Sequence, residues 1–180
     1  MEGKGRITGH TGLLALIGSP VGHSGSPAMY NYSFEKLGLD YAYVAFDIKV
    51  EEVKAALDAM RLFHMRGCNV TMPCKTEAAK YMDELSPAAR IIGAVNTIVN
   101  EDGKLIGHMT DGEGFVGNLR DHGIEIKGKK ITVAGGGGAA TAIQVQCALD
   151  GAREISIFNI KDDFFERTLE TAEKIRKEVP

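Results

Sequence analysis

Short apolar runs and amphipathic segments alternate along the whole chain, with glycine and proline residues between them. Apolar runs bounded by such residues are typical of buried strands, whereas apolar residues spaced three and four apart are typical of helices. The pattern predicts strands at residues 13–18, 41–46, 68–72, 130–134 and 154–158. It predicts helices at residues 27–37, 51–61, 76–81, 86–90, 112–122, 139–149 and 163–178. Residues 94–100 and 105–109 predict a β-hairpin with Asp102–Gly103 at its tip.

Local signals support two of the predicted helices. Ser26 and Pro27 are typical of an N-cap followed by the first helical position, and Gly38 is a natural C-terminal cap for the same helix. The helix at residues 51–61 carries one apolar stripe, formed by Val53, Leu57 and Met60.

The regular alternation of strands and helices predicts an α/β fold with largely parallel sheets. A second β-α-β unit begins after residues 110–114, so we predict two domains, residues 1–111 and residues 112–180. The first is predicted to be an open, mostly parallel α/β domain. The second is predicted to be the first β-α-β part of a Rossmann-like domain.

Composition excludes several classes of protein. The chain has 180 residues, of which 44% are hydrophobic and 25% are charged, and a net charge of −3, so it lacks the basic surface of a nucleic-acid binder. No apolar run approaches the ~20 residues that span a bilayer, and the N-terminus lacks the apolar core of a signal peptide. Three cysteines without CxxC spacing argue against a metal site or a disulfide framework. We therefore expect a cytoplasmic protein that binds no metal, nucleic acid or membrane.

A glycine run lies between the strand at residues 130–134 and the helix at residues 139–149. Gly135, Gly137 and Ala140 fit the pattern G-x-G-x-x-A, in which the glycines permit a tight turn and let the backbone approach a pyrophosphate. Amides at the following helix N-terminus favour an anion. We therefore predict that a dinucleotide is bound by Gly135, Gly136, Gly137, Gly138 and Ala139. A glycine-rich connection without a ligand is the alternative.

The residues after the next strand bear on which dinucleotide is bound. An acidic residue is expected there to hold the ribose hydroxyls, but the strand ends at Asn159. Lys161 could contact a 2′-phosphate, and Asp162 could instead hold a 2′-hydroxyl. The acidic neighbours disfavour a phosphate, so NAD is favoured over NADP. Alternatively, Asp162 and Asp163 simply cap the last helix.

Four polar segments interrupt or follow the apolar runs of the chain. They are HSGSP at residues 23–27, NVTMPCK at 69–75, GAVNT at 93–97 and TDGEGF at 110–115. Open α/β sheets place their binding sites at such strand ends. The segments supply hydroxyl, amide, ammonium and carboxylate groups, carried by Ser24, Ser26, Asn69, Thr71, Lys75, Asn96 and Asp111. This set suits a small polyol that carries a carboxylate.

These segments, in this order and with the glycine turn behind them, resemble the shikimate dehydrogenase family, whose pattern reads roughly HSLSP, NVTxPxK, GAxNT, NTDGxGF and GAGGAA. The resemblance runs from about Leu14 to Asn159, and FNIKDDFFERTLE is closer to the quinate/shikimate branch. It implies reversible NAD(P)-dependent hydride transfer between 3-dehydroshikimate and shikimate, and it leaves quinate open as a further substrate.

The resemblance also implies roles for individual residues. Ser24 and Ser26 would hold the substrate carboxylate, and ring hydroxyls would be bound by Thr71, Asn96 and Asp111. Lys75 and Asp111 would form the catalytic pair at the hydroxyl that is oxidised. Loss of hydride requires that hydroxyl to lose its proton, which a positioned lysine can accept or relay.

Three departures from the family pattern stand out. Gly25 replaces the usual leucine of HSLSP, and Ile160 stands where an arginine is frequent. The family's chains continue beyond the position of Pro180, so we expect a fragment of a longer enzyme. The alternatives are a truncated gene and a piece that persists as a homodimer or as a non-catalytic polyol-binding module. A different two-domain dehydrogenase, such as a folate dehydrogenase, would explain the glycine turn but not HSGSP together with NVTMPCK.

Overall fold

The computed structural model describes residues 7–179. They divide into two compact units. The first comprises the described residues up to Glu84 together with Val95–Gly107, and the second comprises Leu85–Ala94 and the described residues from His108 onward. Within this part of the chain, no helix is both long and apolar enough to cross a membrane.

The first unit is built on a mixed sheet. Its strands are β1 (Gly12–Gly18), β2 (Tyr41–Asp47), β3 (Gly67–Val70), β4 (Glu84–Leu85), β5 (Thr97–Glu101) and β6 (Lys104–His108). Their order across the sheet is β2-β1-β3-β5-β6-β4. β1 pairs in parallel with β2 and β3, whereas β3 pairs antiparallel with β5. The α/β class is confirmed, and the predicted parallel pairing holds for β1, β2 and β3.

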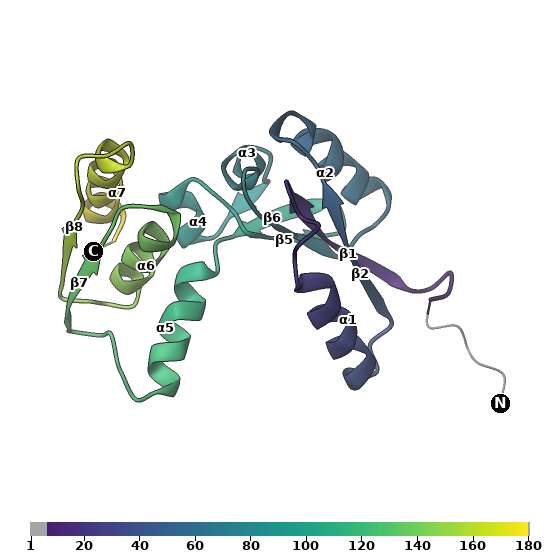
Figure 1. Cartoon of the computed structure of the whole chain (residues 1–180), viewed down its shortest axis with the longest axis horizontal. Helices are drawn as coiled ribbons and strands as arrows, with labels where there is room; N and C mark the ends of the chain where they lie inside the picture. The colour runs from purple at the N-terminus through teal and green to yellow at the C-terminus, as the bar shows by residue number, and fades with distance from the viewer. Residues whose placement is uncertain (1–6, 180) are drawn as a thin grey trace. The chain divides into compact units, whose positions relative to one another are not determined.

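Helices cover both faces of this sheet, as Figure 1 shows for α1 (Ser26–Leu37) and α2 (Val53–Leu62). The 3₁₀ turn Val50–Glu52 precedes α2, and α3 is the short helix Lys75–Ala79. The predicted stripe of α2 is confirmed, because Val53, Leu57 and Met60 are all buried. Side chains alternate in β1, so Leu16 packs with Phe34 of α1 while its neighbour Ile17 faces α2.

Two local predictions about the first unit were wrong. Ser26 is the first residue of α1 and not its N-cap; the cap position is Gly25, and the Ser26 N–H donates to Ser24 Oγ at 3.2 Å. The serine-proline signal located the helix, but the acceptor serine lies two residues earlier. The first hairpin strand begins at Thr97 rather than at residue 94, because the backbone of Val95 and Asn96 bonds to Lys75 and Val70 instead of to the second hairpin strand. The predicted tip is confirmed, with positive φ at Asp102 and Gly103.

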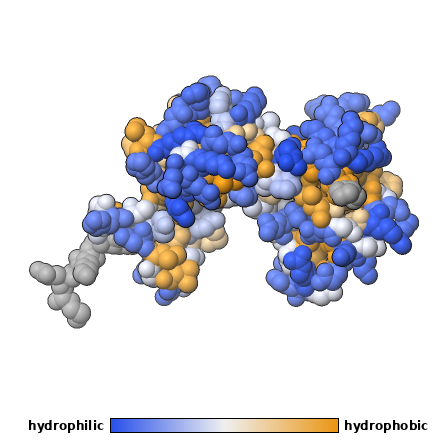
Figure 2. Space-filling model, turned by 180° about the vertical axis from the view of Figure 1, so that it is seen from behind, coloured by the Kyte–Doolittle hydropathy of each residue, from blue (hydrophilic) through white to orange (hydrophobic). Residues whose placement is uncertain are grey.

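The second unit contains the predicted β-α-β arrangement. Its elements are α4 (Pro87–Ile92), α5 (Asp111–Asp121), β7 (Lys130–Ala134), α6 (Gly138–Leu149), β8 (Glu154–Phe158) and α7 (Phe165–Glu178). β7 and β8 pair in parallel, and Val116, Ile126 and Cys147 form a buried cluster. Figure 2 shows apolar residues on the surface of this unit, and the exposed ones include Phe158 at the end of β8 and Ile160 beyond it.

Helix α4 belongs to the second unit although it lies within the predicted first domain. It packs against α6 and α7, and the Arg90 Nε donates to Glu178 Oε2 at 3.1 Å. The compact units therefore differ from the predicted boundary at residues 111 and 112. A single boundary along the chain cannot describe these units, because α4 belongs to the second unit while the residues before and after it belong to the first.

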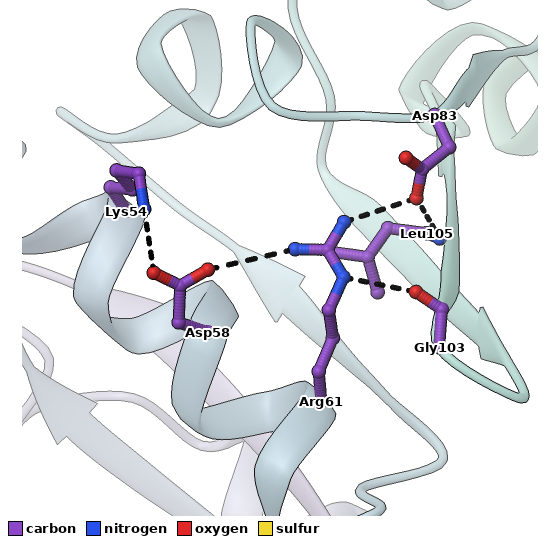
Figure 3. A network of polar contacts seen from close by, with 6 residues as sticks. All are labelled: Lys54, Asp58, Arg61, Asp83, Gly103 and Leu105. Atoms are coloured by element: carbon purple, nitrogen blue, oxygen red, sulfur yellow. Dashed lines mark hydrogen bonds and ion pairs between the residues drawn. The ribbon is translucent and has the colours of Figure 1, made fainter.

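A polar network in the first unit ties α2 to the β5–β6 hairpin (Figure 3). The Arg61 guanidinium donates to the Gly103 carbonyl at 2.9 Å and to Asp83 Oδ2 at 3.0 Å. The same Asp83 oxygen accepts the Leu105 N–H at 2.7 Å. These bonds, that of the Leu105 N–H above all, hold the pKa of Asp83 below its usual range.

We expect Asp83→Asn to lower the free energy of unfolding at pH 7 by about 1 kcal/mol, because the charged partner of Arg61 is lost. The effect is no larger because Asp83 is half-exposed and solvent screens its interactions. A lowered folded-state pKa contributes stability above the unfolded pKa, and that contribution disappears as the pH falls through the folded value. The difference between Asp83→Asn and wild type should therefore shrink below about pH 4. Urea unfolding at several pH values measures it. Glu173→Gln, which breaks an exposed pair with Arg176 outside this network, is the control and should change little.

Candidate functional site

The loops that follow β1 and β3 are joined by backbone hydrogen bonds. The Thr71 N–H donates to the Ile17 carbonyl at 2.9 Å, and the Ser19 N–H donates to the Met72 carbonyl at 3.0 Å. Parallel neighbours end at the same edge of a sheet, which is why the residues after each strand meet there. The start of the loop that carries HSGSP is thus fixed beside Thr71.

The segments NVTMPCK and GAVNT are also bonded to each other. The Val70 N–H donates to the Asn96 carbonyl at 2.8 Å, and the Val95 N–H donates to the Lys75 carbonyl at 3.0 Å. Lys75 is the first residue of α3, and Asn96 directly precedes β5; both side chains belong to half-buried residues. The structure therefore brings together the segments that carry two predicted substrate-binding residues.

A chain of side-chain hydrogen bonds leads from β2 to Asn96. The Tyr43 hydroxyl donates to Asn69 Oδ1 at 2.8 Å, and Asn69 Nδ2 donates to Thr97 Oγ1 at 3.2 Å. The Thr97 hydroxyl in turn donates to Asn96 Oδ1 at 3.1 Å. Burial raises the pKa of Tyr43, so its hydroxyl stays protonated and remains a donor. A pocket of about 340 Å³ lined by Tyr43, Asn69 and Thr97, with Tyr30 stacked on Tyr43, adjoins this chain.

Sequence reasoning did not place Tyr43 at the site. Tyr43 lies 26 residues from Asn69, so only the pairing of the strands brings the two side chains together. The available signal is the alternation in YAYVAF, which puts Tyr41, Tyr43 and Ala45 on one face of β2. A buried tyrosine on that face needs a partner for its hydroxyl.

The predicted carboxylate-binding serines lie at the start of α1. Ser24 precedes the helix and Ser26 begins it, and both are half-buried. Because Ser24 Oγ accepts the Ser26 N–H, the two hydroxyl-bearing residues are held by one local turn. His23, next to them, is exposed.

Asp111 and its neighbour Thr110 belong to the second unit. Asp111 is the first residue of α5 and is exposed, and Thr110 directly precedes the helix. Lys75 belongs to the first unit. Their catalytic pairing therefore stays a prediction.

The glycine turn connects β7 to α6 in the second unit. Gly135 has a φ of 112°, which favours glycine, and its N–H donates to the Phe158 carbonyl at 2.7 Å. A Cβ on Gly136 would collide with Thr168 Oγ1, whereas a Cβ on Gly137 or Gly138 would meet nothing within 4 Å. The turn is thus packed on one side and open on the other, at the N-terminus of α6. This geometry fits a phosphate cradle.

The residues after β8 form a capped turn. Asp162 Oδ1 accepts both the Asn159 side-chain N–H at 3.1 Å and the Phe164 backbone N–H at 3.0 Å. Lys161 places its ammonium 5.9 Å from the centroid of the Phe165 ring. The considered capping of the last helix by Asp162 and Asp163 was wrong: the N-cap of α7 is Phe164, no side chain of the described residues caps the helix, and Asp162 bonds within the turn that precedes it. The role of these side chains in dinucleotide binding stays a prediction.

Within residues 7–179, no three or more His, Cys, Asp or Glu side chains form a group that could hold a metal ion. The three cysteines are buried free thiols. Burial raises the pKa of Cys74, next to Lys75, which disfavours its thiolate.

Strand β7, the glycine turn, α6 and the parallel strand β8 define a Rossmann-like unit, and the first unit is an α/β domain with polar loops at its strand ends. Residues 16–98 match the family model of the shikimate dehydrogenase substrate-binding domain. The chain belongs to the shikimate dehydrogenase family.

Individual relatives agree with this assignment. The chain is 56% identical over 170 residues to the shikimate dehydrogenase (NADP(+)) of Listeria monocytogenes, a match that covers 94% of this chain and 58% of that protein. It resembles the crystal structure of shikimate 5-dehydrogenase from Listeria monocytogenes in complex with shikimate and NAD, with a TM-score of 0.94, 54% identity, and coverage of 97% and 61% of the two chains. It also resembles ligand-free 5-ketofructose reductase of Gluconobacter sp. strain CHM43, with a TM-score of 0.88, 32% identity, and coverage of 96% and 61%. The chain thus spans about three fifths of the length of these relatives.

Proposed function

We propose that this chain supplies the substrate-binding part and the first β-α-β part of the dinucleotide-binding domain of an oxidoreductase that interconverts shikimate and 3-dehydroshikimate. The observation that carries the proposal is the direct bonding of NVTMPCK to GAVNT, which fixes the segments of Lys75 and Asn96 beside each other. Both segments lie within the residues that match the substrate-binding domain of the family.

The proposed chemistry assigns each polar group a task. Ser24 and Ser26 hold the substrate carboxylate at the start of α1, and Thr71, Asn96 and Asp111 bind ring hydroxyls. Lys75 accepts the proton of the hydroxyl that is oxidised, and Asp111 orients the lysine and that hydroxyl. The nicotinamide, when bound, accepts the hydride from the same carbon. The Tyr43–Asn69–Thr97 chain keeps the Asn96 amide in one orientation, so its role is support of the site.

We propose that the cofactor is NAD or NADP, held at Gly135–Gly138 and Ala139, with NAD favoured. Support for the general class comes from the open side of the turn at Gly137 and Gly138. Support for NAD comes from the carboxylate of Asp162 beyond β8, where it would meet ribose hydroxyls and would repel a 2′-phosphate. Against this preference, similar shikimate dehydrogenases of Listeria, Streptococcus and Alkaliphilus are named for NADP(+), and among similar crystal structures one contains NAD and two contain NADP. The protein is proposed to be cytoplasmic, because the reducing cytosol keeps cysteines such as these three as free thiols.

Calorimetric titration tests the proposal without requiring turnover. Shikimate, quinate, NAD and NADP are titrated separately into the chain, and into the longer protein if the reading frame continues past Pro180. We expect saturable binding of shikimate and of a dinucleotide, with NAD the tighter of the two. Shikimate binding without either dinucleotide would indicate a polyol-binding module instead. Binding of neither ligand class would contradict the proposal, and 5-ketofructose would then be the next candidate because of the Gluconobacter likeness.

A further inference from the structure

A buried glutamine of α6 contacts the glycine turn from inside the second unit. Gln144 is fully buried, and its Nε2 donates to the Gly135 carbonyl at 3.1 Å. Its Oε1 is also buried and has no hydrogen-bond partner among the described residues. A buried amide with one unpaired group is costly, and an apolar side chain of similar size would avoid that cost. The bond to Gly135 is therefore the feature that distinguishes Gln144 from its apolar neighbours Val145 and Cys147.

Thr141, one turn earlier in α6, makes a second contact of the same kind. It is 1% exposed, and its hydroxyl donates to the Gly136 carbonyl at 3.3 Å. Two consecutive carbonyls of the turn are thus held by side chains of the helix that follows it.

These two bonds fix the direction of the amides of the turn. In a planar trans peptide, the carbonyl of one residue and the N–H of the next point in opposite directions. Because the carbonyls of Gly135 and Gly136 point towards α6, the N–H groups of Gly136 and Gly137 point away from it. The Gly135 N–H is fixed separately by the Phe158 carbonyl. The side of the turn next to Gly137 and Gly138 is open.

We propose that Gln144, assisted by Thr141, is a positioning residue for the dinucleotide: it holds the peptide planes of the turn so that its amides face the phosphates before the cofactor arrives. The inference rests on the proposed dinucleotide binding. Preorganised donors strengthen binding because no reorientation is needed when the anion docks. A neutral amide is suited to this position, since it donates to a carbonyl without bringing a negative charge near the phosphates.

The first test replaces Gln144 by leucine and measures dissociation constants by calorimetry in the same protein preparations as above. We expect the dissociation constant of the dinucleotide to rise about tenfold, equivalent to about 1.4 kcal/mol, the size of one hydrogen bond. The constant for shikimate, whose predicted carboxylate-binding residues lie in the first unit, should not change. Gln146→Leu is the matched control: it lies in the same helix, its Nε2 donates to Asp150 Oδ1 at 2.9 Å, and it should bind the dinucleotide like wild type.

Gln144→Glu adds a readout that a purely structural role would not produce. A buried carboxyl has a raised pKa, and its protonated form can donate to the Gly135 carbonyl, whereas the carboxylate cannot. As the pH falls from about 8 to about 5, the dinucleotide affinity of Gln144→Glu should therefore rise towards that of wild type measured at the same pH. Thr141→Val, a nearly isosteric change, should weaken dinucleotide binding severalfold if Gln144→Leu fails to fold.

The outcomes separate the two proposals. If wild type binds a dinucleotide and Gln144→Leu and Thr141→Val bind it equally well, the positioning role is wrong and the proposed function stands. If wild type binds no dinucleotide in any preparation, the proposed function fails first and the positioning role fails with it.

Discussion

Replacing Lys75 by methionine is expected to lower the rate of shikimate-dependent dinucleotide reduction by about 10²–10⁴-fold, the usual contribution of a positioned proton-transfer group. Methionine keeps much of the aliphatic length of lysine but cannot accept a proton or donate hydrogen bonds. The proton of the oxidised hydroxyl would then have to pass to water. Initial rates under saturating shikimate and dinucleotide measure the effect, in the chain and in the longer protein if the reading frame continues.

The fold should tolerate this substitution. Both bonds that join the two polar segments are made by the backbone, and the one at Lys75 uses its carbonyl, which accepts the Val95 N–H and is unaffected by the side chain. Lys80→Met is the matched control, because Lys80 is the C-cap of the same short helix, is exposed and pairs with Glu77 at 2.6 Å. Its rate should stay close to that of wild type. Equal rates for Lys75→Met and wild type would rule out the catalytic assignment.

The second large effect is expected at Gly136. Gly136→Ala should lower the free energy of unfolding by about 1–3 kcal/mol, the usual range for overpacking, because the new Cβ collides with Thr168 Oγ1 and lies 3.1 Å from Asn159 Nδ2. The family pattern GAGGAA carries alanine at this position. In this chain Thr168 of α7 occupies the space that such an alanine would need.

A double-mutant cycle tests that explanation. Thr168→Ala removes the colliding oxygen, so Gly136→Ala should cost much less in the Thr168→Ala background than in wild type. Gly137→Ala is the control, because its Cβ meets nothing within 4 Å and its φ of −70° suits alanine. Unfolding by urea should show little change for Gly137→Ala. An equal cost of Gly136→Ala in both backgrounds would show that Thr168 is not the cause.

Hydrophobic periodicity was sufficient to predict most of the elements. The stripe of α2 and the strand-turn-helix around Gly135–Gly138 follow from spacing within a few residues, so local sequence carries them. The two-residue strand β4 was not predicted, because Glu84–Leu85 has no pattern of its own and exists through pairing at the edge of the sheet. The packing of α4 with α6 and α7 also depends on distant residues.

In the candidate site, too, some features follow from local sequence and others depend on residues far apart in the chain. The meeting of the loops after β1 and β3 follows from parallel strands that end at one edge. The partners of Asn69 and Gln144 could not be predicted. Tyr43 bonds Asn69 from a strand that is distant in sequence. In the sequence, Gln144 is one polar residue in a largely apolar helix, and nothing in that pattern indicates its partner. The pairing of Lys75 with Asp111 remains a prediction of the family resemblance.

Transfer of an isotope label tests the central proposal most directly. Shikimate deuterated at the carbon that bears the oxidised hydroxyl is incubated with the protein and NAD or NADP, and the reduced nicotinamide is analysed by mass spectrometry. Hydride transfer at this site predicts that about one deuterium appears in the nicotinamide for each shikimate oxidised. Binding of both ligands by the complete protein, without any deuterium in the nicotinamide, would contradict it.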